Sequence, residues 1–195
     1  MKQMHLHDFI NRLRELEAEG FADELVLRFL SQHEPTRESL APYRHFDSEQ
    51  YARNLIYRDD VFELLLLCWR PHQATPVHDH DGQRGWVRVI EGSLSLINFD
   101  RVRTETDLRQ IAEGESSPPG SVVLIERNRL VISAGQAIME VTAPETIHRV
   151  GAATTGAVSL HLYSRPIETC FIFDLVSHSC RRGRPRVYSR FDAFA

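Results

Sequence analysis

The sequence contains little cysteine and no long apolar run. Its three cysteines form neither a CxxC pair nor an even-numbered set, so they predict no disulfide framework, and reduced thiols in a cytoplasm are the default expectation. The longest apolar run, Leu64–Trp69, is far shorter than the about 20 residues that span a bilayer as a helix. The N-terminus, Met1–Gly20, carries acids and lacks the apolar stretch of a signal peptide. These absences favour a cytoplasmic protein without a membrane partner.

Positive charge is not in excess either. The formal net charge is −4 with ten histidines counted neutral, which gives no reason to expect a nucleic-acid partner. Arginines do cluster within Cys180–Phe191, and we interpret this run as a solvated tail. With 42% apolar and 26% charged residues, the composition is that of a folded, soluble chain.

Internal linkers, low-complexity tracts and sequence repeats are also missing. A chain of 195 residues is long enough for one domain with a proper core, whereas two domains would be cramped. We therefore expect one domain over residues 1–195. The sequence leaves its oligomeric state open, a monomer included.

Helical periodicity is confined to the first part of the chain. Apolar residues recur at spacings of three and four from Leu6 to Leu16, which predicts a helix with Gly20 as its C-cap. Two further helices are predicted over Phe21–Gln32 and Ser48–Arg58. Together they would form a small helical cap over about residues 1–58.

From Phe62 onward the pattern changes to short, often alternating β segments rich in valine, isoleucine and leucine. Turn residues separate them at 91–92, 116–121, 134–136 and 151–156. Many short strands at close spacing predict a mainly β fold, an antiparallel barrel or sandwich over about residues 60–180. The predicted strands include Phe62–Trp69, Gly85–Asp100, Ser121–Glu126, Leu130–Gly135, Ala137–Ala143 and Ala157–Ser164.

Three histidines are candidate metal ligands. His78 and His80 stand two residues apart where a strand is expected, so both imidazoles would point to the same side. Imidazole suits zinc, copper, iron or nickel. Such a pair also occurs on surface strands without metal, but His148, on a later predicted strand, could complete a facial set of three. His72 lies in a loop, and we do not take it as a ligand.

Four stretches together resemble a known family. They are Tyr51–Ile56 (YARNLI), Leu67–His80 (LCWRPHQATPVHDH), Ile147–Gly151 (IHRVG) and Ala157–Asp174 (AVSLHLYSRPIETCFIFD). This part of the chain is similar to the thiol dioxygenases of the cysteine dioxygenase family, bacterial type, within the cupin superfamily. The resemblance implies a cupin jelly-roll barrel. It also accounts for the absence of a carboxylate ligand, because Arg84 and Gly85 stand where the usual cupin carries a glutamate ligand.

The resemblance implies a non-haem Fe(II) site on His78, His80 and His148. Without a carboxylate in the ligand set, a small thiol substrate would supply the anionic ligand as thiolate, with O₂ as the second reactant. Both oxygen atoms would end on sulfur, so that L-cysteine becomes cysteine sulfinate. The sequence does not exclude loading with zinc or nickel.

The family also implies roles for residues around the metal. Arg53 would bind the substrate carboxylate, with Tyr51 placed to support it, although a surface helix arginine is the alternative. Ser159, His161 and Tyr163 alternate on one predicted strand and would face the same way. In this reading His161 orients Tyr163, whose hydroxyl lies near oxygen and thiolate. A histidine satisfied within the core is the alternative for His161.

Two positions depart from the family pattern, and a third keeps it. Mammalian members carry at the Gly85 position a cysteine that is thioether-linked to the tyrosine, so we predict an unmodified Tyr163. Arg165 stands where the cysteine enzymes have a proline, which leaves open whether the preceding peptide bond is cis, because a non-proline cis bond costs about 2.5–4 kcal/mol. Arg165 would also add a second cation to the site. Cys170 is retained near the family's pocket, where packing alone also explains it.

Several alternatives remain open at this stage. Arg53 and Arg165 together could serve a dicarboxylate thiol such as mercaptosuccinate, whereas members acting on 3-mercaptopropionate lack the Arg53-type arginine. A non-thiol cupin metal enzyme, or a ligand-binding cupin sensor, could use the same three histidines. Trp69 and Trp86 are expected to be barrel packing.

Overall fold

Two amphipathic helices cover one side of a large sheet in the computed structural model, which describes residues 1–141 and 146–190. Helix α1 (Leu6–Glu15) buries apolar side chains at spacings of three and four, and α2 (Asp23–Gln32) follows it after a 3₁₀ turn. Gly20 ends that turn with a φ of 75°, the left-handed conformation that glycine adopts without strain. Both predicted helices and the glycine cap are confirmed.

The rest of the N-terminal part is short. Strand β1 (Lys2–Met4) pairs in parallel with β2 (His33–Pro35), and the single turn α3 (Arg37–Leu40) leads into a 3₁₀ turn over Ala41–Tyr43. None of the helices in residues 1–141 and 146–190 is both long and apolar enough to cross a membrane.

The helix predicted over Ser48–Arg58 is wrong. The segment forms strand β3 (Ala52–Arg58), which pairs antiparallel with β4 (Glu63–Trp69). Its alternate residues are buried on two sides, and pairing with β4 satisfies its backbone in a way that local helix propensity cannot match. The last α-helix therefore ends at Leu40, and the jelly-roll strands begin at Ala52, earlier than the expected limit of about residue 60. A single 3₁₀ turn over Leu108–Gln110 lies later in the described chain.

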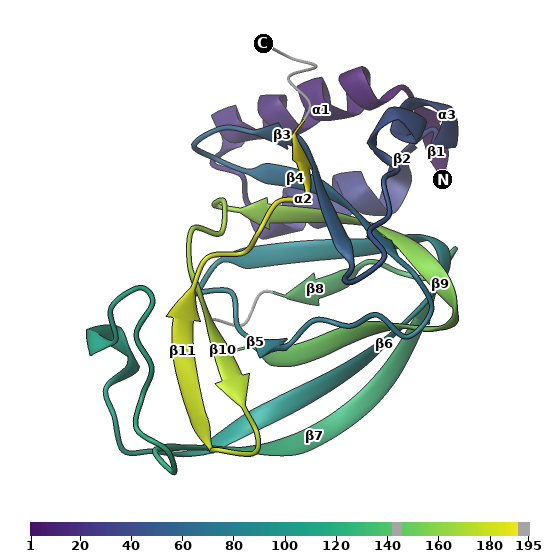
Figure 1. Cartoon of the computed structure of the whole chain (residues 1–195). Coiled ribbons are helices and arrows are strands. Elements are labelled where there is room, and N and C mark those ends of the chain that lie inside the picture. The colour runs from purple at the N-terminus through teal and green to yellow at the C-terminus, as the bar shows by residue number, and fades with distance from the viewer. Residues whose placement is uncertain (142–145, 191–195) are drawn as a thin grey trace.

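The remaining strands form the predicted mainly β jelly-roll (Figure 1). They pair in the order β11-β10-β5-β9-β4-β3-β12, and β6 joins β9 to β7 and β8. Their bounds are β5 Val77–His78, β6 Arg84–Thr104, β7 Val122–Ser133, β8 Met139–Val141, β9 Ile147–Ser164, β10 Cys170–Asp174, β11 Ser179–Gly183 and β12 Ser189–Arg190.

Several predicted boundaries differ from the observed ones. The strands expected over 121–126 and 130–135 are one strand, β7. Of the strand expected over 137–143, residues 142–143 lie outside the described residues. The turns expected at 91–92 and 151–156 lie inside β6 and β9, where the register shifts. Gly92 and Gly156 have φ of 71° and 70° there, and a Cβ on Gly92 would lie 2.2 Å from the Gly156 carbonyl oxygen. The glycines bend both strands sharply without ending their pairing.

The alternation of side chains on the central strands separates two cores. On β4 and β9 one set of alternate residues packs against the helices, and the other faces the interior of the jelly-roll. The helix-facing set is Leu64, Leu66, Cys68, Val158, Leu160 and Leu162, whereas the inward set includes Leu65, Leu67, Trp69 and Tyr163. Burying each large apolar side chain contributes roughly 1.5–3 kcal/mol. The pattern that stabilises the fold also directs the polar residues of β9 inward.

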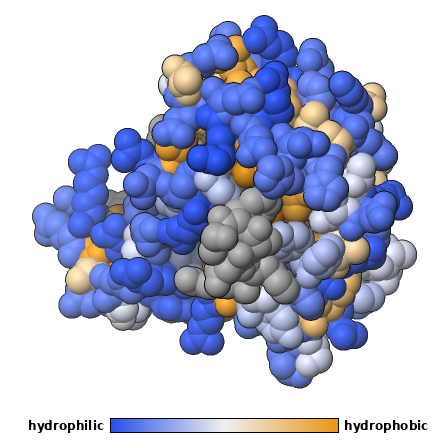
Figure 2. Space-filling view, turned by 90° about the horizontal axis from the view of Figure 1, so that it is seen from above, coloured by the Kyte–Doolittle hydropathy of each residue, from blue (hydrophilic) through white to orange (hydrophobic). Residues whose placement is uncertain are grey.

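The surface seen from above is largely hydrophilic, with hydrophobic residues in small, scattered areas (Figure 2).

Candidate metal centre and substrate cavity

Three imidazoles meet at one end of the jelly-roll interior. His78 on β5 is directly opposite His148 on β9, and His80 follows two residues after His78. The ligand atoms of the three histidines all lie within 4.8 Å of one another. Within the described ranges, this cluster contains no carboxylate or cysteine. The structure thus brings together all three predicted ligands.

Strand β5 is shorter than the sequence indicated, because it ends at His78. His80 is held by the turn that follows. Asp79 anchors this turn to β10, since its Oδ1 accepts from the Phe171 backbone N–H at 2.8 Å and its own N–H donates to the Phe171 carbonyl at 3.1 Å. Asp79 was missed in the sequence, although its place between the two histidines was a signal.

The three histidines are suited to hold a metal ion. Burial lowers the pKa of His78 to about 4, and it lowers the pKa of His80 and His148 well below the ordinary value. All three are therefore neutral near pH 7, with a lone pair on each ring. Both ring nitrogens of His80 and Nδ1 of His148 are buried without a hydrogen-bond partner among the described residues. Unpartnered nitrogens inside a protein are costly, and a bound metal ion would remove that cost.

The orientation of His78 follows from its second nitrogen. Nδ1 lies 3.1 Å from the Pro76 carbonyl oxygen, which can only accept, so Nδ1 carries the proton. The lone pair is then on Nε2, and the carbonyl fixes both tautomer and ring orientation, as is usual for metal-binding histidines.

A buried chain of hydrogen bonds runs along β9. Ser159 Oγ lies 2.8 Å from His161 Nε2, and His161 Nδ1 lies 3.0 Å from the Tyr163 hydroxyl. The Tyr163 ring packs on His80, with ring centroids 5.6 Å apart. Trp69 Nε1 donates to Ser159 Oγ at 2.9 Å. Trp69 was expected to be packing only, so the sequence missed its polar role.

The indole sets the direction of this chain. An indole N–H can only donate, so Ser159 accepts from Trp69. Within the described residues the Ser159 hydroxyl has one other partner, His161 Nε2, to which its proton goes. His161 then carries its proton on Nδ1 and donates to the Tyr163 oxygen, which leaves the Tyr163 proton free for a further acceptor. Burial lowers the pKa of His161 to about 3 and raises that of Tyr163, so both groups keep these forms near pH 7.

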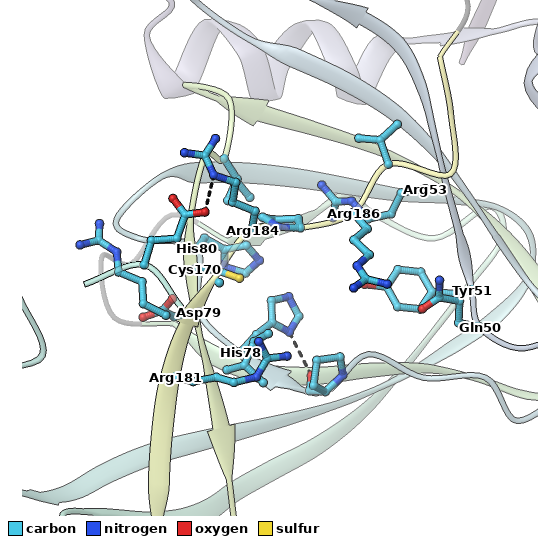
Figure 3. Close-up of a pocket in the computed structure, with 18 of the residues that line it drawn as sticks. Gln50, Tyr51, Arg53, His78, Asp79, His80, Cys170, Arg181, Arg184 and Arg186 are labelled. Carbon is cyan, nitrogen blue, oxygen red and sulfur yellow. Dashed lines mark hydrogen bonds and ion pairs between the residues drawn. The ribbon is translucent and has the colours of Figure 1, made fainter. Parts of the chain in front are cut away.

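A cavity of about 1050 Å³ opens beside His78 and His80 (Figure 3). Arg53 and Tyr51 line it. Arg53 is 8% exposed, and its Nε is buried with no hydrogen-bond partner in the part of the chain that the structure describes. Tyr51 stacks on Trp69 with ring centroids 4.5 Å apart. The helix context expected for Arg53 is wrong, since β3 carries it into the interior opposite Leu67.

Glu63 is a buried carboxylate that sequence reasoning missed, although it interrupts an apolar run. It is 1% exposed, accepts from the Ile167 backbone N–H at 3.2 Å, and has Oε1 3.7 Å from an Arg53 guanidinium nitrogen. Burial raises the pKa of Glu63, and the charge of Arg53 opposes that rise. Glu63 therefore holds one side of the Arg53 guanidinium and leaves the Nε side available.

The structure does not bring Arg165 to the cavity. Its side chain is exposed and is not among the described residues that line the cavity, while its backbone N–H donates to Gln83 Oε1 at 2.8 Å. The Ser164–Arg165 peptide bond, left open by the sequence, is cis.

The arginine run after Cys180 is not a solvated tail, which corrects the expectation. Strand β11 pairs with β10, and β12 pairs with β3. Between them the chain passes the mouth of the cavity, and four arginines line it: Arg181, Arg182, Arg184 and Arg186. Cys170 lines the same cavity, and burial raises the pKa of its thiol to about 11.

Fold and site together define a metal-binding cupin. The chain matches the family "Cysteine dioxygenase type I" over residues 1–176. Cysteine dioxygenase type 1 of Danio rerio is 28% identical over 178 residues, and that of Rattus norvegicus 29% over 178 residues, each match covering 89% of this chain and 81% of the relative. A solved cupin superfamily protein of Desulfitobacterium hafniense DCB-2 aligns with a TM-score of 0.45 at 13% identity, covering 68% of this chain and 92% of that one. The chain belongs to the cysteine dioxygenase type I family and is a thiol dioxygenase.

Proposed function

We propose that this protein is a non-haem iron(II) enzyme that adds both atoms of O₂ to the sulfur of a small thiol amino acid, with L-cysteine converted to cysteine sulfinate. One observation carries the proposal: His78 and His80, two members of a neutral cluster of three imidazoles, line the same cavity as Arg53, a buried arginine whose Nε has no hydrogen-bond partner among the described residues. The first suits a divalent metal, and the second suits a carboxylate at a fixed distance from it.

His78, His80 and His148 would hold the iron. Three neutral ligands leave its charge uncompensated, which favours an anionic substrate ligand. When bound, ferrous iron would lower the pKa of the thiol and hold the sulfur close to O₂. The three free, buried cysteines agree with a reducing compartment, and we place the enzyme in the cytoplasm.

Arg53 would fix the substrate carboxylate. Its buried Nε has no partner within the described residues, and a guanidinium can offer a carboxylate two parallel hydrogen bonds. Glu63 restrains the guanidinium from the far side. Tyr51 would line the path of the substrate chain, stacked on Trp69. Holding both ends of a small substrate in this way converts binding energy into orientation.

Tyr163 would act as the proton donor. His161 donates to its oxygen, so the phenol proton is directed away from His161, and the ring lies against the ligand His80. Burial raises the pKa of Tyr163, which keeps the phenol protonated at neutral pH. Ser159 would hold His161 in the required tautomer.

The test is product formation by protein loaded anaerobically with Fe(II) and then exposed to O₂. L-Cysteine, cysteamine, 3-mercaptopropionate and mercaptosuccinate should be compared, with oxygen uptake and sulfinate measured together. We expect sulfinate and O₂ in equal amounts, and a lower kcat/KM for cysteamine, which has no carboxylate for Arg53. Zinc-loaded protein is the control and should consume no oxygen. If the iron-loaded protein oxidised no thiol, a non-thiol cupin enzyme or a ligand-binding cupin would replace the proposal.

A further inference from the structure

The cavity mouth carries more positive charge than one carboxylate requires. Five arginines and two acidic residues line the cavity, a formal surplus of three positive charges in a chain of net charge −4. Two of these arginines have acidic partners. Arg182 donates to Asp81 at 3.0 Å, and Arg184 donates to Glu113 at 2.6 Å. Arg181 and Arg186 have no side-chain hydrogen bond or ion pair to any part of the chain that the structure describes.

Arg181 on β11 points to the same side of the sheet as the metal-ligand candidate His78 on β5, with β10 between the two strands. It is paired with Ile172 on β10, and Ile172 is paired with His78 on β5. Residues directly opposite in paired strands point to the same side, so Arg181 and His78 share the cavity face. Two strand spacings place their Cα atoms about 10 Å apart. The charge of Arg181 also lowers the pKa of the Cys170 thiol against the larger effect of burial, which agrees with this placement.

Arg186 approaches the cavity from the side of Arg53. The backbone N–H of Tyr188 donates to the Arg53 carbonyl at 2.8 Å and ties this segment to β3. Arg186 comes two residues earlier, which is about 7 Å along an extended chain. Both Arg186 and Tyr188 line the cavity, and in Figure 3 the Arg186 side chain extends toward Tyr51.

We propose that Arg181 and Arg186 form a second anion-binding subsite at the cavity mouth, so that the enzyme oxidises L-cysteine but acts more efficiently on a thiol acid with a second carboxylate. This inference rests on the proposed function and names its substrate class. Arg53 takes one carboxylate in the interior, and the two mouth arginines take the other. The second carboxylate is bound and not transformed, so the reaction remains R–SH + O₂ → R–SO₂H.

The size of the cavity supports this substrate class. Small-molecule sites usually enclose about 300–1,000 Å³, and this cavity of about 1050 Å³ has room beyond a cysteine-sized ligand. Two kinds of molecule carry the required groups: a short thiol dicarboxylate, and a cysteinyl peptide with an acidic residue. Mercaptosuccinate represents the first, and cysteinylglutamate the second.

The experiment compares selectivity in the iron-loaded enzyme. kcat/KM is measured for mercaptosuccinate, cysteinylglutamate and L-cysteine in the wild type, in the double variant Arg181→Gln/Arg186→Gln, and in Arg28→Gln. Arg28 is an exposed arginine on α2 outside the cavity lining, so its substitution removes the same kind of charge elsewhere. We expect the double variant to lower the ratio of dianionic thiol to cysteine at least tenfold, and Arg28→Gln to leave it unaltered. The dianionic thiol whose kcat/KM falls more in the double variant shows whether the natural substrate is a short thiol dicarboxylate or an acidic cysteinyl peptide. An unchanged ratio in the double variant, or equal losses for cysteine and both dianionic thiols, would overturn the subsite.

A binding measurement separates this inference from the proposed function. Calorimetric titration of the same proteins with succinate and with butyrate requires no turnover. We expect succinate to bind at least tenfold more tightly than butyrate in the wild type, and this preference to disappear in the double variant. If that result is found while no thiol is oxidised, the proposed function fails and the subsite stands. Equal binding of the two acids by the wild type would overturn the subsite, whatever the turnover.

Discussion

Gly85 lies directly opposite Tyr163 across the β6–β9 pair, and a Cβ added at Gly85 would lie 2.8 Å from the tyrosine ring atoms Cδ1 and Cε1. The ring therefore occupies the space that any larger residue at position 85 would need. Gly85 has no side chain to bond to the ring, so we expect Tyr163 to be unmodified. Mass spectrometry of the tryptic peptide that contains Tyr163 should give the mass of its unlinked sequence. A cross-linked peptide would contradict this.

Removal of the Tyr163 hydroxyl should slow the reaction without loss of metal. Tyr163→Phe keeps the ring over Gly85 and against His80 but removes the proton that His161 directs outward. General acid catalysis commonly contributes about 10²–10⁴-fold, and we expect kcat to fall within that range. Iron content, measured on the same sample, should stay at the wild-type value. Full turnover in the variant would remove Tyr163 from the mechanism.

Trp69→Phe tests the direction of the hydrogen-bond chain. The change removes the donor to Ser159 but leaves an aromatic ring to stack on Tyr51. A lost hydrogen bond of about 1 kcal/mol should lower kcat several-fold, with KM for the thiol little altered. The ¹⁵N shifts of His161 should also report a changed tautomer population.

Trp86→Phe is the matched control for that change. Trp86 is equally buried at 1% exposure and belongs to the core under the helices. Its indole nitrogen has no hydrogen-bond partner within residues 1–141 and 146–190. Its replacement should lower the stability and leave the His161 shifts as they are. If both variants altered kcat and the His161 shifts alike, Trp69 would act through packing alone.

The buried, neutral His161 should make the metal-free protein sensitive to acid. Its pKa is lowered from 6.5 to about 3, mainly by burial. The unfolded chain thus binds one more proton than the folded chain between these values, and stability present above pH 6.5 is lost as the pH falls. In His161→Gln, the slope of unfolding free energy against pH should be shallower by about 1.4 kcal/mol per pH unit near pH 5. Urea unfolding at several pH values measures it, and parallel slopes would contradict it.

Metal retention should depend on His148 and not on His72. His148→Ala removes one of the three imidazoles of the cluster, whereas His72 is an exposed loop histidine outside it. We expect the iron content of His148→Ala to fall severalfold or more after gel filtration, and that of His72→Ala to equal the wild type. Equal iron in both variants would show that the metal is held elsewhere.

The sequence by itself determined much of this protein, because the relevant information is local. Spacings of three and four predict α1, and alternation on β9 aims Ser159, His161 and Tyr163 to one side. The histidine pair at 78 and 80 was visible because the two residues are close in sequence, although β5 ends at His78 and the following turn places His80. Residues two to four positions apart are related by the geometry of one element, which the chain carries without reference to the rest.

Only the tertiary structure decided which residues far apart in the sequence lie next to one another at the site. Segment 52–58 forms a strand because β4 and β12 pair with it. This pairing directs the Arg53 side chain toward the cavity. Trp69 reaches Ser159 across a sequence separation of 90 residues. The arginines after Cys180 line the cavity because β11 and β12 hold that segment against it. Strand partners and register depend on the burial of apolar side chains over the whole chain, so they cannot be predicted from a short segment of the sequence.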